Sequence, residues 1–317
     1  MRALLCCAVL FATFGVARAQ TVVRVGLFPN VTHAQALVAK NLGAEGQGWF
    51  EQRLGPGTKV EWFVYNAGPS AMEAIFARSI DFTYVGPSPA VNAYARANGR
   101  DVRIVAGAMR GGEALVVRGD AINKIEDFRG KAIATPQLGN TQDVECRAWL
   151  INHGIRVTLI GGDARVLPTA NPDILSLFQQ GQLDAAWTVE PWVSRLVSEA
   201  GGRIFFEPEN AVTTVLAGRE EFLRTNPELA RKFAAAHHEL TRWIRDHPEE
   251  AQRRVRDELS ILSHKEIPLA LIQQAWTRLQ FDDTISVEPF QSFLDQARLV
   301  GFLRAKIDLS SLLWNPQ

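Results

Sequence analysis

The sequence predicts an α/β fold built as two domains, and three observations lead to this prediction. Short β-branched runs alternate with helical stretches along most of the chain, a pattern typical of α/β sheets with largely parallel strands. The alternation restarts after Arg118. The chain has 317 residues and is 47% hydrophobic, which is enough for about two domains that each bury a core.

The first residues are expected to be an export signal. Arg2 precedes an apolar run from Ala3 to Gly15, and Ala17–Ala19 has the small-x-small cleavage pattern, so we expect residues 1–19 to be removed. The run is too short for a membrane-spanning helix, which needs about 20 apolar residues. No cysteine follows the cleavage pattern. We therefore expect a soluble periplasmic protein without a lipid anchor.

The next stretch reads as one α/β unit. A β-branched run that ends before Pro29 predicts the first strand, and proline and glycine positions separate the later elements. The expected strands are Thr21–Phe28, Val60–Tyr65, Phe82–Val85 and Val102–Ala108, and the expected helices are about His33–Leu42, Ala71–Ala77 and Pro89–Ala97.

After Arg118 the same logic predicts a second unit, followed by a helical tail. Ala114–Val117 is a further expected strand just before Arg118. After it the pattern gives strands at a run ending with Thr135 and at Leu183–Thr188, and helices at Gln142–His153, from Asn171 to Gly181 and at Trp192–Ala200. From Pro227 onward the chain is mostly helical. We expect this tail to return and brace the first unit.

Charge and cysteine content exclude some classes of protein. The 34 basic residues balance the 34 acidic ones, so nucleic acid is not an expected partner. Removal of the signal leaves Cys146 as the only cysteine, which rules out an internal disulfide. We expect this thiol to be a packed small hydrophobe rather than a nucleophile.

Polar side chains gather in loops where expected strands end and helices begin. In an open α/β sheet these loops meet at the carboxyl ends of the strands, where ligands bind. Helix starts offer free N–H groups and a partial positive charge, so several of them can bind an anion without Lys or Arg. The candidates from the four loops are Asn30, Thr32 and His33; Asn66 and Ser70; Gly86 and Ser88; and Asn140 and Thr141.

Each of these loops alone could simply cap a helix. Ser70 and Glu73 form the S-x-x-E pattern of a capping box, and Ser88 precedes Pro89 as an N-cap would. Four such loops spread over both units favour a ligand cleft between the units.

Three further residues have two open interpretations. Trp187 and Glu190 could give a ligand an aromatic wall and a carboxylate, or they could be a core residue and a solvated turn acid. Arg110 lies where the chain leaves the first unit, and it could pair with a bound anion or be a surface charge.

Catalytic patterns are scarce. The sequence has no H-E-x-x-H, G-x-S-x-G or G-x-x-x-x-G-K-[ST] motif, and no lysine lies in the candidate loops. We therefore expect a binding protein rather than an enzyme, with no cofactor and no metal.

The order of five segments resembles a known family over essentially the whole chain after the signal. The segments are Val25–Ala34, Asp81–Ala90, Leu138–Asp143, Asp184–Trp192 and Glu220–Leu229. In these segments the chain is similar to periplasmic substrate-binding proteins of ABC importers, in the nitrate/sulfonate/taurine group, and most like aliphatic sulfonate-binding proteins.

The resemblance implies a type II periplasmic-binding-protein fold, in which two α/β domains are joined by a two-crossing hinge with the ligand cleft between them. We place the crossings near Gly112 and Thr214, which gives domain I as 20–112 and 214–317 and domain II as 113–213. By position, the family's pocket maps onto Asn30, His33, Asn66, Ser70, Ser88, Asn140, Thr141, Trp187 and Glu190.

The function implied is that of a monomeric receptor. It would bind a small organic anion, such as an alkanesulfonate or taurine, and deliver it to an ABC permease in the inner membrane. The carboxylate of Glu190 would suit an amine-bearing or hydroxylated ligand. The alternatives are an enzyme related to thiamine-pyrimidine synthases, a receptor that feeds a sensor, and a receptor for nitrate, a phosphonate or a pyrimidine.

Overall fold

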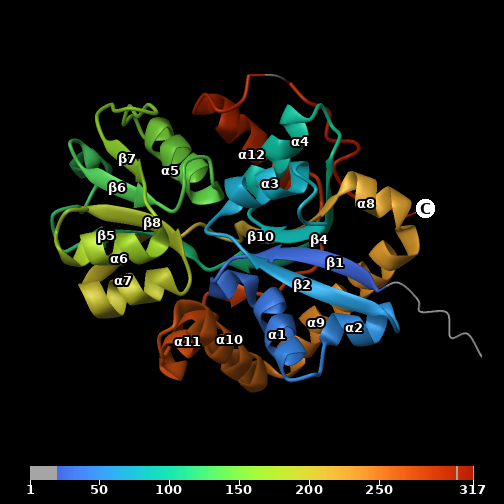
Figure 1. Ribbon diagram of the computed structural model, residues 1–317. Helices are drawn as coiled ribbons and strands as arrows, with labels where there is room; N and C mark the ends of the chain where they lie inside the picture. The colour runs from blue at the N-terminus through green and yellow to red at the C-terminus, as the bar shows by residue number, and fades with distance from the viewer. Residues whose placement is uncertain (1–19, 305, 317) are drawn as a thin grey trace, which may run out of the picture.

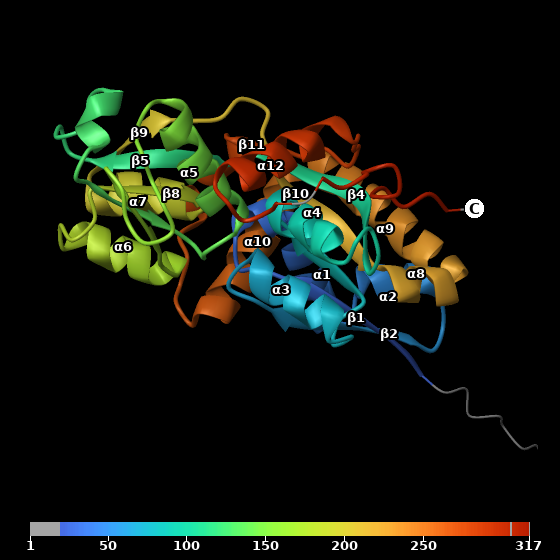
Figure 2. The same cartoon turned by 90° about the horizontal axis from the view of Figure 1, so that it is seen from above.

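Two β-sheets, each covered by helices, form two lobes that lie side by side (Figure 1, Figure 2). The structure is a computed structural model and describes residues 20–304 and 306–316. The expected export signal, residues 1–19, lies outside the described residues. We call the lobe with the six-stranded sheet lobe I and the lobe with the five-stranded sheet lobe II.

Lobe I has a mixed sheet with the strand order β11-β4-β10-β3-β1-β2. Its strands are β1 (Thr21–Leu27), β2 (Thr58–Val64), β3 (Phe82–Val85), β4 (Val102–Gly111), β10 (Val212–Arg219) and β11 (Leu279–Gln280). β1 is parallel to β2 and β3, whereas β10 is antiparallel to β3 and β4.

Lobe II has the strand order β7-β6-β8-β5-β9. Its strands are β5 (Glu113–Arg118), β6 (Ala132–Thr135), β7 (Arg165–Pro168), β8 (Ala185–Val189) and β9 (Gly202–Phe206). β6 is parallel to β7 and β8, and β5 is antiparallel to β8 and β9.

The expectation of largely parallel sheets is therefore wrong. Three strands run opposite to the others in their sheets: β5, with which the chain enters lobe II, β10, with which it returns to lobe I, and the two-residue β11 at the sheet edge. A strand that enters a lobe from the other lobe runs away from the junction, whereas β1, β3, β6 and β8 end at the junction. That opposition makes both sheets mixed.

Helices cover both faces of the lobe I sheet (Figure 1). On one face lie α1, α2, α9 and α10, and on the other lie α3, α4 and α12. The bounds in lobe I are α1 (Ala34–Ala44), α2 (Trp49–Leu54), α3 (Gly68–Phe76), α4 (Pro87–Arg96), α8 (Glu220–Thr225), α9 (Pro227–Asp246), α10 (Pro248–Ser263), α11 (Leu269–Trp276) and α12 (Glu288–Leu299). The helical tail thus braces the first unit as expected, since α9 packs on α2 and α10 packs on α1.

Lobe II carries α5 (Thr141–Asn152), α6 (Asn171–Gln179) and α7 (Trp192–Ala200). Short 3-10 turns lie at Val31–His33 and Ile125–Phe128. Helix α12 packs against α4 of lobe I and α5 of lobe II, so it also touches both lobes.

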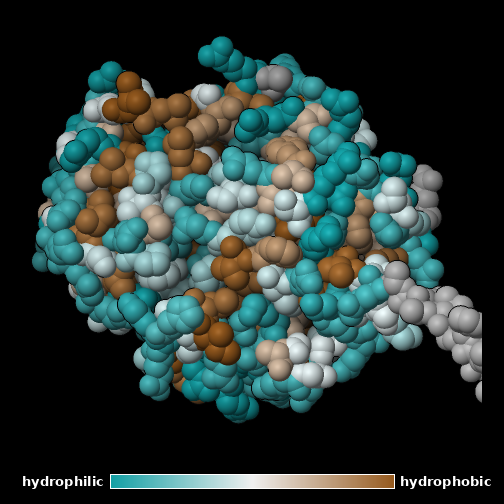
Figure 3. All heavy atoms as spheres, in the orientation of Figure 1, coloured by the Kyte–Doolittle hydropathy of each residue, from teal (hydrophilic) through white to brown (hydrophobic). Residues whose placement is uncertain are grey.

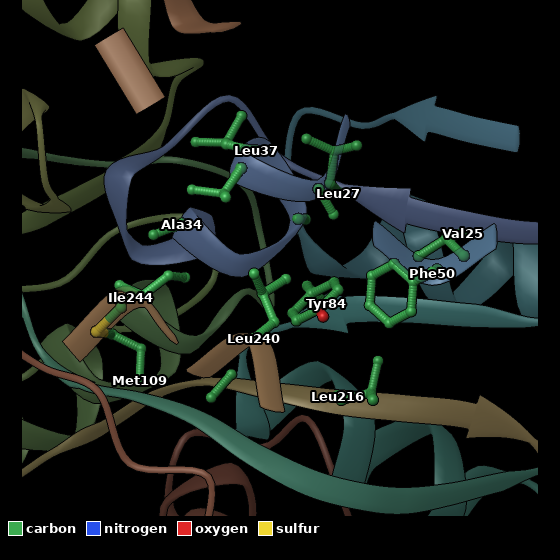
Figure 4. Close-up of a cluster of buried hydrophobic side chains, with 14 of the residues drawn as sticks. Val25, Leu27, Ala34, Leu37, Phe50, Tyr84, Met109, Leu216, Leu240 and Ile244 are labelled. Carbon is green, nitrogen blue, oxygen red and sulfur yellow. The ribbon is translucent and has the colours of Figure 1, made fainter. Parts of the chain in front are cut away.

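A large apolar core lies between the lobe I sheet and the α1/α9/α10 layer (Figure 4). Phe50 and Phe82 both stack on Phe233, with ring centroids 4.2 and 4.3 Å apart. Burial of such aromatic rings contributes most of the energy of a core. In lobe II, Cys146 is buried as expected, and burial raises the pKa of its thiol, so the group stays protonated.

The chain crosses between the lobes at two short segments. The first lies between β4 and β5, at Gly111 and Gly112, whose φ values are 68° and 73°. Only glycine adopts this backbone region without strain. The second lies between β9 and β10, so Thr214 already belongs to the returning strand. These crossings bring the ends of β1, β3, β6 and β8 to the same junction.

The outer surface of the face in Figure 3 is mostly hydrophilic, with hydrophobic residues in separate patches. No helix among residues 20–304 and 306–316 combines the length and the hydropathy needed to cross a bilayer.

Candidate functional site

A narrow cavity lies at the junction of the lobes; its empty space is about 360 Å³ with the solvent at its mouth included, of which the centre of a water molecule can reach about 20 Å³. Lobe I contributes the segment after β1, the start of α3 and the start of α4, and lobe II contributes the start of α5 and the end of β8. The lining residues are Phe28, Asn30, Thr32, His33, Asn66, Ala67, Gly68, Gly86, Pro89, Pro136, Asn140, Thr141, Gln142, Val189 and Thr213. This lining contains no Lys, Arg, Asp or Glu.

Side-chain amides form much of the polar wall, and the oxygens of three of them are already engaged. Asn30 Oδ1 accepts a hydrogen bond from Trp192 Nε1 at 3.1 Å. Asn140 Oδ1 accepts one from the backbone N–H of Asp143 at 2.9 Å, and Gln142 Oε1 accepts one from Asn140 Nδ2 at 3.1 Å. What these three amides offer a ligand is therefore N–H donors.

His33 adds a neutral donor. Burial lowers the pKa of its imidazole to about 3, so the ring carries no charge at neutral pH. Its Nδ1 accepts a hydrogen bond from the backbone N–H of Phe28 at 3.3 Å. The proton of the neutral ring is therefore on Nε2, and His33 can donate from that atom.

Helix starts converge on the cavity from both lobes. The first residues of α3 and α5 line it, and Gly86 and His33 are the residues before α4 and α1. Their partial positive charges add to the donor character of the wall. α4 contributes fewer N–H groups than the others because Pro87 and Pro89 have none.

Hydrogen bonds join the lobes on one side of the cavity, next to β8. The backbone N–H of Val31 in lobe I donates to the carbonyl of Glu190 in lobe II at 2.9 Å. The Trp192–Asn30 bond lies on the same side. Arg278 of lobe I, near the end of α11, pairs with the Glu190 carboxylate at 3.1 Å.

A second set of bonds joins the lobes near the starts of α3 and α5. Gln137 Nε2 donates to Ser70 Oγ at 3.1 Å, and Asn66 Nδ2 donates to the carbonyl of Pro136 at 3.4 Å. The backbone N–H of Ser88 donates to Thr141 Oγ1 at 3.4 Å. Bonds on both sides of the cavity give the lobes a closed arrangement.

The structure brings seven of the candidate residues to this cavity. They are Asn30, Thr32, His33, Asn66, Gly86, Asn140 and Thr141. Asn140 also caps α5 through its side chain.

Ser70 and Ser88 lie beside the cavity but do not line it. The predicted capping box at Ser70 is wrong, because α3 begins at Gly68 and Ala67 is its N-cap. Ser88 is likewise not an N-cap, since α4 begins at Pro87 after Gly86. Both serines contribute to contacts between the lobes instead.

Trp187, Glu190 and Arg110 are engaged away from the cavity lining. Trp187 packs in the lobe II core against Trp149 and Phe206, because its side chain lies on the core face of β8. The Glu190 carboxylate accepts hydrogen bonds from the backbone N–H and hydroxyl of Ser194 and pairs with Arg278.

Arg110 pairs with Asp282 at 2.7 Å and donates to the carbonyl of Asn210. Trp187 is therefore a core residue, as one of its two interpretations had it. Glu190 is fully buried and Arg110 is partly buried in an ion pair, so the interpretations as a solvated turn acid and as a simple surface charge are wrong.

Sequence reasoning did not single out Phe28, Gln142 and Thr213 as site residues. Gln142 stands in the same helix-start loop as Asn140, so its position was the available signal. Thr213 lies on β10, a strand that the sequence analysis did not predict.

Comparisons with known proteins give a consistent picture. The model of the NMT1-like family matches residues 17–257. A taurine-binding periplasmic protein of Escherichia coli is 28% identical over 184 residues, which cover 56% of this chain and 55% of that protein. A putative aliphatic sulfonates-binding protein of Bacillus subtilis is 24% identical over 217 residues, 66% of this chain and 63% of that protein. The matched regions thus span less than two thirds of these relatives.

Solved structures match over more of the chain. The alkanesulfonate-binding protein SsuA from Xanthomonas axonopodis, bound to MOPS, superposes with a TM-score of 0.75 at 20% identity, covering 94% of this chain and 99% of that one. The periplasmic nitrate-binding protein NrtA from Synechocystis gives a TM-score of 0.73 at 16% identity, covering 90% and 83%. These similarities confirm the expected periplasmic-binding-protein fold.

Proposed function

Since this chain belongs to the NMT1-like family, we propose that it is a periplasmic receptor that binds a small organic anion and delivers it to an ABC permease. The ligand class is a short alkanesulfonate or a close analogue. The names of the relatives support a receptor of this kind.

One observation carries the proposal. The cavity wall offers N–H donors from the amides of Asn30, Asn140 and Gln142, whose oxygens are all engaged within the protein. Neutral donors and helix starts bind an anion without a fixed cation. They also leave no buried charge unpaired when the cavity is empty.

The apolar part of the wall favours an alkyl tail over a second charged group. Phe28, Val189 and Pro136 supply apolar surface. No carboxylate lines the cavity, because Glu190 is paired with Arg278. A ligand ammonium therefore has no ionic partner here, and we expect ethanesulfonate to bind at least as tightly as taurine.

Closure follows from the two sets of contacts between the lobes. A ligand shifts an open–closed equilibrium only by its preference for one form. An anion held by Asn30 and His33 from lobe I and by Asn140 and Gln142 from lobe II has both sets of donors only in the closed form. Micromolar affinity corresponds to about 8 kcal/mol, which several charge-assisted hydrogen bonds of about 1.5–3 kcal/mol each can supply.

Isothermal titration of the purified protein tests the proposal. The panel is methanesulfonate, ethanesulfonate, taurine, ethylphosphonate and nitrate, with ethylammonium as a cationic control. We expect saturable binding of a sulfonate and no binding of the cation. Absence of binding by every anion in the panel would refute the anion receptor, and tighter binding of nitrate alone would change the ligand class.

A further inference from the structure

A buried carboxylate lies directly behind the lobe II wall of the cavity. Glu113 is the first residue of β5, next to the hinge residue Gly112, and it is fully buried. Its Oε2 accepts a hydrogen bond from Gln142 Nε2 at 2.5 Å. Gln142 lines the cavity, whereas Glu113 does not.

The bond from Gln142 is the first of a directed series. Gln142 Oε1 accepts from Asn140 Nδ2, and Asn140 Oδ1 accepts from the backbone N–H of Asp143. An ionised carboxylate can only accept hydrogen bonds, so it fixes the amide nitrogen of Gln142 toward itself and the amide oxygen toward Asn140. Each amide then keeps one N–H that donates to no other group among the described residues.

A reversed Gln142 amide would give the opposite wall. Its oxygen would face the carboxylate of Glu113 and its nitrogen would face Asn140 Nδ2, so acceptor would meet acceptor and donor would meet donor. The carboxylate excludes this arrangement, because buried polar groups without partners are costly.

We propose that Glu113 is a positioning residue that sets Gln142 and Asn140 as hydrogen-bond donors and so makes the lobe II wall selective for anions. The inference rests on the proposed function for its ligand, but its effect on the amides exists without any ligand.

The surroundings of Glu113 allow it to hold the charge. Burial raises its pKa, whereas the hydrogen bond from Gln142 and the neighbouring Glu145 and Trp187 side chains act in the opposite direction. Burial and the neighbouring Glu113 charge raise the pKa of Glu145 well above its ordinary value. Glu145 is therefore the more readily protonated member of the pair, and the negative charge lies mainly on Glu113.

Other nearby groups are committed elsewhere. Trp187 Nε1 is buried and forms no hydrogen bond among the described residues. Arg147, on the same helix as Gln142, pairs with Asp143 at 3.1 Å. Glu113 thus has only neutral donors around it. Its negative charge weakens anion binding, whereas its hydrogen bond orients the amides of Gln142 and Asn140.

A double-mutant cycle separates these two effects. E113Q removes the charge and the obligatory acceptor, and Q142A removes the amide that Glu113 positions. We expect E113Q to raise the Kd for ethanesulfonate by a factor that is at least about five times larger with Gln142 present than in the Q142A background. E145Q is the matched control, since its amide can still donate to Glu113, and we expect a Kd within about twofold of the wild type.

Nuclear magnetic resonance of the ligand-free protein gives an independent readout. With the Gln142 side-chain amide assigned, we expect one downfield proton in the wild type and in E145Q, and its loss together with faster amide rotation in E113Q. Equal effects of E113Q in both backgrounds, or an unchanged Gln142 amide in E113Q, overturn the inference. If no anion binds the wild type, the proposed function fails, and the amide spectrum alone still decides the role of Glu113.

Discussion

Replacing Asn30 by aspartate changes the cavity only by turning one side-chain NH2 group into a carboxylate oxygen. Asn30 is 5% exposed and lines the cavity, and its Oδ1 accepts the hydrogen bond from Trp192 Nε1. An aspartate oxygen can accept the same bond, so the contact between the lobes is retained. The amide N–H donors become a second carboxylate oxygen at nearly the same place.

The expected loss of affinity follows from charge. Two unit charges about 4 Å apart repel by about 4 kcal/mol at the effective dielectric constant near a protein surface, and a lost hydrogen bond to a charged group costs about 1.5–3 kcal/mol. With part of the repulsion relieved by solvent, we expect N30D to weaken ethanesulfonate binding at least about 100-fold at pH 7.5. Because burial of an unpaired carboxylate raises its pKa, affinity should partly recover as the pH falls.

Isothermal titration at pH 7.5 and pH 5.5 measures both effects. N152D is the control, since Asn152 is exposed at the end of α5 and the change adds the same charge. We expect its Kd to stay within about twofold of the wild type. Unchanged binding by N30D would show that no anion lies next to Asn30, and equal losses in both variants would make the effect one of net charge alone.

Three further predictions concern stability and the hinge. E145Q should raise the unfolding temperature more at pH 8 than at pH 5. The raised pKa of Glu145 makes the wild type lose stability as the pH rises above the pKa of this group in the unfolded chain. The control E126Q, on an exposed turn, should not show this difference. Acidification from pH 6.5 to pH 4.5 should lower the free energy of unfolding by about 2–3 kcal/mol through His33, because its pKa of about 3 leaves the unfolded state binding more protons. Calorimetry should show a smaller loss of stability in H33Q, and an H33Q profile parallel to that of the wild type would contradict this. G112A should weaken ethanesulfonate binding and lower the unfolding temperature, because φ is 73° and an added Cβ meets Leu279; G119A has the same kind of backbone without a close neighbour and should leave the Kd unchanged.

The sequence was sufficient for the helices and strands that carry regular patterns. Phe82–Val85 and Trp192–Ala200 have the expected bounds. β10 was not predicted, although it is central in the lobe I sheet. Its place between β3 and β4 depends on contacts distant in sequence.

The candidate site divides in a similar way. Residues at helix starts, such as Asn30 and Asn140, reach the cavity because strand ends and helix starts meet at one edge of each sheet. The environment of Trp187 depends on which face of β8 its side chain takes. That of Glu190 depends on its ion pair with Arg278, which is distant in sequence. No local pattern records such a partner.

The most direct test of whether both lobes bind the same anion is a crystal structure of the protein with ethanesulfonate, with the sulfonate located by its anomalous sulfur signal. We expect sulfonate oxygens within hydrogen-bonding distance of Asn30 Nδ2 or His33 Nε2 from lobe I, and of Asn140 Nδ2 or Gln142 Nε2 from lobe II. A sulfonate bound by one lobe alone, or bound outside this cavity, would contradict the account.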